Sequence, residues 1–171
     1  GVISELTTRE LPERVGDPQL ALSTALNHVN ISDDSRDQRV DEAVQMIERS
    51  ASEGAPDQQP SWLRVKAVFL DAVGDERASE AWRRAIEADP SNVALRTEAI
   101  ESNALGYDAD FVRDNINKIV ELTATQGRTL PSRLRLARAK SIFGREPTRQ
   151  KRDEAIAIVA VDEIGADDTR P

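Results

Sequence analysis

Residues 62–90 read WLRVKAVFLDAVGDERASEAWRRAIEADP, and this stretch decides the fold class. Apolar side chains recur at intervals of three and four residues, which is the period of one helix face. They fall into two runs, Trp62, Val65, Phe69 and Val73, and then Ala78, Trp82, Ala85 and Ile86. Gly74-Asp75 predicts a short turn between two helices. Asp89-Pro90 ends the second helix, because proline disfavours helical geometry in the residue before it.

Helical stripes continue toward the N-terminus. Pro18 is typical of a first helical turn, and Ser32-Asp33-Asp34-Ser35 supplies capping residues between two helices. Residues 54–60 predict a loop, after which Ser61 caps the helix that holds Trp62. The two stripes are Leu22, Ala25, Leu26 and Val29, and then Val40, Ala43, Val44 and Ile47.

Four more helices are predicted after Pro90, with breaks near 106–108, at 127–131, at Gly144 and at Pro147-Thr148. The run at 155–161 is rich in β-branched residues and also fits a buried strand. An isolated strand would have no pairing partner, so we predict a helix there. The sequence thus predicts an all-α chain of eight helices in four antiparallel pairs. The four stripes are Val93, Ala99 and Ile100; Val112, Ile116, Ile119 and Val120; Leu134, Leu136, Ala137 and Phe143; and Ala155, Ile156, Val159 and Ala160.

The opening stretch resembles a tetratricopeptide repeat. The second helix of that family carries a small residue, an aromatic residue and a second small residue before a proline, and Ala78, Trp82, Ala85 and Pro90 have the family spacing. Two further residues, Trp62 and Phe69, match large positions of the first helix, whereas Gly74 comes one residue later than in the family pattern. The resemblance implies that small residues let the two helices approach closely around the aromatic ring.

The other helix pairs match this pattern less well. Adding 34 to the second-helix positions leads to Val112, Ile116, Ile119 and Ala124, while Ala43 and Ile47 precede Ala78 and Trp82 by 35 residues. Residues 153–155 repeat the letters of 41–43. The resemblance implies an α-solenoid, in which helix pairs stack into a right-handed superhelix. Another helical solenoid or bundle is the alternative.

We predict three parts in the chain. Residues 1–15 form an N-terminal flank or partial helix, 16–164 a tetratricopeptide-like domain of about four helix pairs, and 165–171 a tail. Gly1 is typical of a cloning remnant, so we expect a segment of a longer protein. Arginine outnumbers lysine 19 to 4, as in GC-rich genomes. We expect a soluble bacterial protein of the cytoplasm or periplasm.

The composition excludes several classes of protein. No cysteine is present, which excludes a disulfide scaffold, thiol catalysis and a zinc ribbon. The 23 basic and 31 acidic side chains give a net charge of −8, which argues against nucleic acid as a partner. No apolar run approaches the roughly 18 residues of a membrane span. We expect neither a cofactor nor a metal.

Basic residues are concentrated in one segment of this acidic chain. Residues 128–152 hold nine basic side chains and a single acidic one, Glu146. Arginine binds carboxylates with two parallel hydrogen bonds, so the segment predicts docking of an acidic protein or peptide. A solvated surface that pairs with acidic parts of the chain is the alternative, because the charges lie on opposite helix faces. The candidate residues are Arg133 and Lys140 on one face, and Arg135 and Arg138 on the other.

A second apolar stripe lies beside Trp62 on the same predicted helix. It consists of Leu63, Ala67 and Leu70. A helix that is apolar on two sides either lines an apolar groove, where a partner binds, or packs against neighbouring helices on both sides. Both interpretations stay open from the sequence.

No residue pattern indicates catalysis or metal binding. His28 is the single histidine and is flanked by Asn27 and Asn30, so we predict an ordinary surface or capping residue. Asp33-Asp34 lacks the ligand spacing of a calcium-binding loop, as does the pair Asp108 and Asp110. We expect that pair to cap a helix that begins near Phe111. Phosphate-binding and nucleophile-elbow motifs are absent.

The tetratricopeptide resemblance implies a non-catalytic protein-interaction scaffold that binds a peptide or a partner domain on its concave face, which is lined mainly by the first helix of each pair. A structural spacer or oligomerisation segment, with its grooves filled by neighbouring repeats, is one alternative. A helical enzyme or ligand-binding domain is the other. The sequence names neither the partner nor the oligomeric state.

Overall fold

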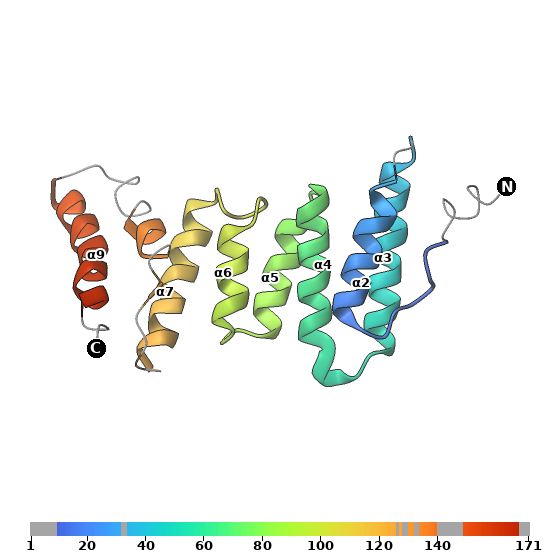
Figure 1. Ribbon diagram of the computed structural model, residues 1–171, viewed down its shortest axis with the longest axis horizontal. Coiled ribbons are helices and arrows are strands. Elements are labelled where there is room, and N and C mark those ends of the chain that lie inside the picture. Colours follow the sequence, from blue (N-terminus) through green and yellow to red (C-terminus); the bar gives the residue numbers. More distant parts are fainter. Residues whose placement is uncertain are drawn as a thin grey trace. The chain divides into compact units, whose positions relative to one another are not determined.

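The computed structural model describes residues 10–31, 34–125, 127, 130–131, 134–139 and 149–167. The chain divides into two compact units, Gly1–Pro90 and Ser91–Pro171, and each is described by itself. Every regular element among the described residues is a helix, as Figure 1 shows. The predicted all-α class is therefore confirmed.

The described residues of the first unit form four α-helices and one short 3-10 helix. They are α2 (Pro18–Val29), α3 (Arg36–Glu53), η1 (Pro56–Gln58), α4 (Gln59–Val73) and α5 (Ala78–Ala88). Helix α2 packs against α3, and α4 packs against α5. Helix α4 also contacts both α2 and α3, so the second helix pair lies directly against the first (Figure 1).

The start of α4 differs from the prediction. Residues 54–60 were predicted as a loop with Ser61 as the cap, but a 3-10 turn begins at Pro56 and α4 begins at Gln59. Proline suits the first turn of a helix, where its missing N–H has no intrahelical partner. The side-chain amide of Gln59 donates to the carbonyl of Ala51 in α3 at 2.6 Å, which ties this helix start to the preceding helix.

The predicted turn between α4 and α5 is confirmed. Gly74 ends α4 in the left-handed conformation with φ of +72°, which glycine adopts at no steric cost. The N–H of Gly74 donates to the carbonyl of Asp71 at 3.1 Å, and that of Asp75 donates to the carbonyl of Leu70 at 3.0 Å. These bonds satisfy carbonyls that the end of the helix leaves without partners.

Large and small apolar side chains alternate in the core of the first unit. Several alanines of this unit are buried in the core, among them Ala78 at 1% and Ala85 at 0% exposure. Trp82 is 3% exposed and Trp62 1% exposed, so both rings are core residues. The other large, fully buried side chains of this unit are Met46, Ile47, Val65, Phe69 and Leu70, and the alanines at 0% exposure are Ala21, Ala25, Ala43, Ala67 and Ala85.

The second unit contains α6 (Val93–Glu101), α7 (Ala109–Thr125) and α9 (Arg149–Asp167), and residues 134–139 are also helical. Helix α6 packs against α7. Asp108 caps α7 by accepting a hydrogen bond from the N–H of Phe111 at 3.0 Å, as predicted. Asp110 was predicted to share this role. It lies instead inside the first turn, because α7 begins at Ala109, and it pairs with Arg113 at 3.1 Å.

The two ends of the chain are described only in part. Residues 10–15 form no helix, and residues 1–9 of the predicted flank lie outside the described residues. The run at 155–161 is part of helix α9, so the prediction of a helix there is confirmed and the strand alternative is wrong. Helix α9 continues to Asp167, three residues into the predicted tail. Phe143, Gly144, Pro147 and Thr148 lie outside the described residues.

Candidate functional site

The second apolar stripe of α4 is mostly buried. Ala67 and Leu70 have exposures of 0%, and Leu63 is half-buried. Helix α4 contacts α2, α3 and α5, so apolar side chains on two of its sides are covered by neighbouring helices. Burial supports the packing interpretation for Ala67 and Leu70. Of the three residues predicted to bind a partner on this helix, Leu63 alone keeps partial contact with solvent.

Helix α2 offers a more open surface than the predicted stripe does. Leu20 is 58% exposed, and Ser23 and Asn27 are exposed on the same side of the helix. On the neighbouring helix α4, Ser61 is exposed and Val68 half-buried. Leu20 is followed directly by the buried residues Ala21 and Leu22, so the sequence shows one apolar run. Sequence reasoning missed Leu20 because only its position around the helix places it on the exposed side.

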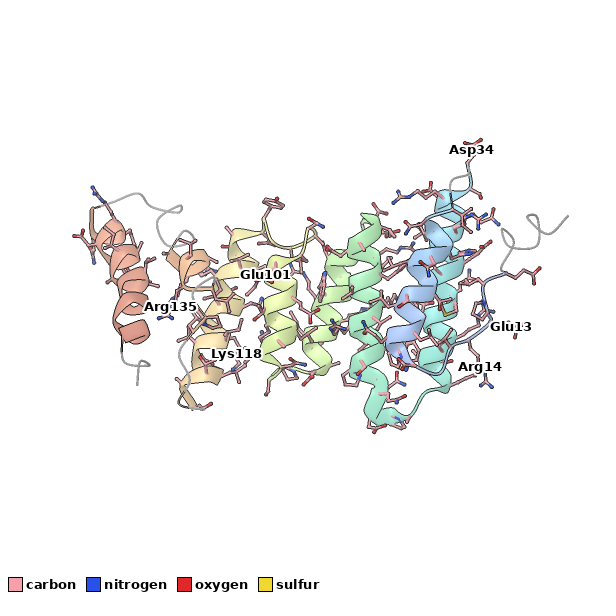
Figure 2. The ribbon with its side chains drawn as sticks, in the orientation of Figure 1. Glu13, Arg14, Asp34, Glu101, Lys118 and Arg135 are labelled. Carbon is pink, nitrogen blue, oxygen red and sulfur yellow. The ribbon has the colours of Figure 1, made fainter. Side chains whose placement is uncertain are left out.

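The basic candidates are described in part. Arg133 and Lys140 lie outside the described residues, so their arrangement stays a prediction. Arg135 and Arg138 are half-buried on the short helix 134–139. Figure 2 labels Arg135, whose side chain projects from this helix. The Nε atom of Arg138 is buried and finds no hydrogen-bond partner among the described residues.

His28 is buried, and its prediction as a surface or capping residue is wrong. The residue is 9% exposed, and its Nε2 lies 2.7 Å from Oε2 of Glu42 in α3. A carboxylate only accepts hydrogen bonds, so Nε2 carries the proton in this contact. His28 follows the fully buried Ala21 and Ala25 by seven and three residues, and this helical register is the sequence signal for its burial.

Glu42 is held by hydrogen bonds on both carboxylate oxygens. Gln38 donates from Nε2 to Oε1 at 2.9 Å while His28 holds Oε2. The bond from His28, and after it the bond from Gln38, lowers the pKa of Glu42 below its ordinary value, because both favour the charged carboxylate. The ring of His28 is buried and hydrogen-bonded to Glu42, so we interpret this pair as a packing contact between α2 and α3.

Four carboxylates of α3 contact other parts of the first unit. Each of these residues pairs outside its own helix. The three pairs other than His28–Glu42 are largely exposed, and exposed pairs contribute about 0–1 kcal/mol each. Their partners come from the N-terminal segment, α2, α4 and the turn before α5, so they align α3 with its surroundings and do not converge on one ligand position. The pairs are Arg14–Glu53 (Arg14 is labelled in Figure 2), His28–Glu42, Lys66–Glu48 at 2.6 Å and Arg77–Asp41 at 2.8 Å.

Within the described part of the chain, no group of three or more histidine, aspartate or glutamate side chains is placed to hold a metal ion. Among the helices in that part, none combines the length and the apolar character that crossing a membrane requires. Comparison of the chain with protein-family models, with curated proteins and with solved structures gives no match.

Proposed function

We propose that this chain is a non-catalytic protein-interaction scaffold, built as a tetratricopeptide-like stack of helix pairs from a larger protein. The contact of α4 with both helices of the preceding pair carries the proposal. Stacking of a pair on its predecessor is the feature that makes helical repeats extend into superhelices with a long binding face. The residue pattern of α4 and α5, from Trp62 to Pro90, supports the same architecture.

The binding face in this proposal is formed by the first helices of the pairs, α2 and α4. These helices contact each other. Leu20 exposes most of its side chain on α2, with Ser23 and Asn27 beside it, and Leu63 is half-buried on α4. An apolar side chain flanked by hydroxyl and amide groups suits a peptide that presents one apolar residue and a polar backbone.

A selection of random displayed peptides on the full chain tests this function. Peptides that share a sequence pattern are synthesised, and their Kd is measured against the wild type and against Leu20→Glu. We expect the substitution to raise Kd by about tenfold, because burial of a leucine side chain on binding contributes about 1.5–3 kcal/mol. Circular dichroism checks that the variant keeps its helices.

A matched variant places the same charge on the second helix of the first pair. Gln45 is exposed on α3, and Gln45→Glu leaves the proposed face untouched. We expect its Kd to equal that of the wild type. An equal rise in Kd for Leu20→Glu and Gln45→Glu would contradict the proposed face. A selection whose peptides share no sequence pattern would contradict it as well.

A structural spacer or oligomerisation segment is the second candidate function. The complete burial of Ala67 and Leu70 favours it, because these apolar positions are already covered by helices of the same chain. Sedimentation velocity of the full chain separates the candidates. Concentration-dependent assembly that Leu20→Glu abolishes, without any peptide binding, would favour the oligomerisation segment.

A further inference from the structure

The chain segment before α2 lies against the end of α3. Residues 10–16 form no helix, and they run beside α3 to the start of α2 (Figure 1). The backbone N–H of Val15 donates to the hydroxyl oxygen of Ser50 at 2.9 Å. The guanidinium group of Arg14 pairs with the carboxylate of Glu53. Both contacts join a non-helical segment to side chains in the last turn of α3, as in a bound peptide.

Ser50 provides a fixed hydrogen-bond acceptor in this turn. The residue is 4% exposed with the segment in place, and its hydroxyl donates to the carbonyl of Met46 at 2.7 Å. A hydroxyl has one proton and two acceptor lone pairs, so this bond leaves only acceptor capacity. The oxygen therefore matches one backbone N–H from outside the helix, and Val15 supplies it.

The last turn of α3 also favours a positive charge. It has no basic residue, and Glu53 ends the helix. The carbonyl groups at the end of a helix carry a partial negative charge, so a carboxylate there is unfavourable and a cation is favourable. Arg14 brings the cation from outside the helix. The site is thus suited to a basic side chain that stands next to an N–H donor.

The residues that occupy the site form a short pattern. Leu11 and Val15 are half-buried, whereas residues 12–14 between them are exposed. The pattern is one aliphatic residue, two exposed residues, an arginine and a second aliphatic residue. A segment of another protein with this pattern can make the same contacts.

The polar contacts that hold the segment are few and weak. Arg14 is 70% exposed and Glu53 is 54% exposed, so water and salt screen their attraction. The other contact is one hydrogen bond between uncharged groups, which replaces hydrogen bonds to water. A Cβ at Gly16 would meet nothing within 4 Å, so the chain is not packed where it leaves the site. The segment therefore covers the site reversibly.

We propose that the last turn of α3 binds a non-helical segment of a partner protein that carries an arginine followed by an aliphatic residue, and that residues 11–15 occupy this site as an internal competitor. The partner segment binds by displacing its counterpart in this chain. A basic segment also complements the net charge of −8 of the chain. This inference goes beyond the proposed scaffold function, because the site lies on α3 and not on the face of α2 and α4.

NMR titration of the isotope-labelled full chain tests the site. The probe is a synthetic peptide of residues 10–17, ELPERVGD. A loosened chain carries Arg14→Ala, which removes the ion pair, and Val15→Pro, which removes the N–H donor. An occupied site raises the apparent Kd by the inverse of the open fraction, so we expect the peptide to bind the loosened chain about tenfold more tightly than the wild type. The backbone amide signals of residues 50–54 are expected to shift.

Substitutions in the loosened chain define the chemistry of the site. Ser50→Ala removes the acceptor and Glu53→Arg reverses the charge, and each is expected to raise Kd by about fivefold. A peptide with glutamate in place of its arginine should bind Glu53→Arg more tightly than the original peptide does. Glu48→Arg is the matched control, because Glu48 is 53% exposed on the same helix and Glu53 is 54% exposed. Its Kd is expected to change by less than about twofold.

Several results would overturn this inference. Equal Kd values for the wild type and the loosened chain would exclude an internal competitor. An equal rise in Kd for Glu48→Arg and Glu53→Arg would show a diffuse charge effect. Signal changes on α2 and α4 in place of α3, or none at the highest soluble peptide concentration, would show that α3 holds no such site.

Further measurements separate the alternatives. Sedimentation velocity tests a second copy as the occupant. Assembly of the wild type that the loosened chain lacks would show exchange of residues 11–15 between copies and would contradict a partner protein. Leu20→Glu should leave the Kd of this peptide unchanged, so this site and the proposed binding face can fail independently. Circular dichroism confirms that each variant is folded, and Glu53→Arg decides the test if Ser50→Ala unfolds.

Discussion

Arg77 binds Asp41 across two helix pairs, with Nη2 of the arginine 2.8 Å from Oδ1 of the aspartate in α3. The same guanidinium donates two hydrogen bonds to Asp75 in the turn between α4 and α5. Nε lies 2.8 Å from Oδ1, and Nη2 lies 2.8 Å from Oδ2. The two-pronged bond to Asp75 orients the guanidinium before it reaches Asp41. The turn that ends α4 is therefore also linked to α3 through Arg77.

We expect Asp75→Asn to lower the free energy of unfolding more than Asp41→Asn does. Asp75 has 18% of its side chain exposed and loses a charged, two-pronged partner, whereas Asp41 is 60% exposed and loses one solvent-screened contact. For Asp41 the coupling to Arg77 in a double-mutant cycle is expected at about 0.2–1 kcal/mol. Urea denaturation of both single variants measures the order, and a larger loss for Asp41→Asn would contradict it.

Ala67→Leu should destabilise the protein by about 1–3 kcal/mol, because extra methylene groups in a close-packed core force neighbouring side chains and backbone apart. Ala67 has an exposure of 0%. Ala72→Leu is the matched control, since Ala72 is exposed on the same helix. We expect the control to unfold at the wild-type urea concentration. If both variants matched the wild type, Ala67 would line an open groove and not a packed interface.

Gly106→Ala should lower stability by about 1–3 kcal/mol through crowding in the turn between α6 and α7. A Cβ at this position would lie 2.5 Å from the carbonyl oxygen of Ser102 and 2.9 Å from that of Ile100, and backbone atoms cannot move aside as a flexible side chain does. Gly16→Ala is the control, because a Cβ there meets nothing within 4 Å. Thermal unfolding of the two variants measures the contrast. Equal melting temperatures would refute the crowding argument.

Stability should fall on acidification through the titration of Glu42. The hydrogen bonds from His28 and Gln38 place the pKa of Glu42 in the folded protein below its ordinary value of 4.5. A lowered pKa means that the carboxylate contributes stability above the unfolded value, and that this contribution is lost as the pH falls through the folded value. Urea unfolding from pH 7 to pH 3 is expected to show this loss.

Glu42→Gln is expected to make the acid part of that profile shallower, because the side chain no longer titrates. Glu80→Gln removes a carboxylate that is 64% exposed and pairs within its own helix, and it serves as the control. The same change of slope in both variants would mean that the His28–Glu42 contact contributes nothing specific to the pH dependence.

Much of the local structure follows from short stretches of sequence. Gly74 lies where the chain needs a positive φ, Asp108 caps α7, and the apolar period predicts most of the helices. The run at 155–161 was ambiguous by its residues, and the helical neighbours decided the prediction of a helix there. These features depend on steric effects and hydrogen bonds between residues that are close in the chain, so the local amino-acid sequence is sufficient to predict them. The start of α4 was mispredicted because its tie to Ala51 depends on the preceding helix.

The sequence by itself therefore determined that this chain is helical, where its main turns fall, and that its basic residues gather in one segment. Only the tertiary structure decided which faces of those helices meet water. The apolar side chains of Ala67 and Leu70 fit both an open groove and a packed interface. They are buried because neighbouring helices pack against α4. His28 and Glu42 are 14 residues apart and meet because α2 lies against α3. Burial depends on contacts between elements, and helical periodicity does not specify which elements meet.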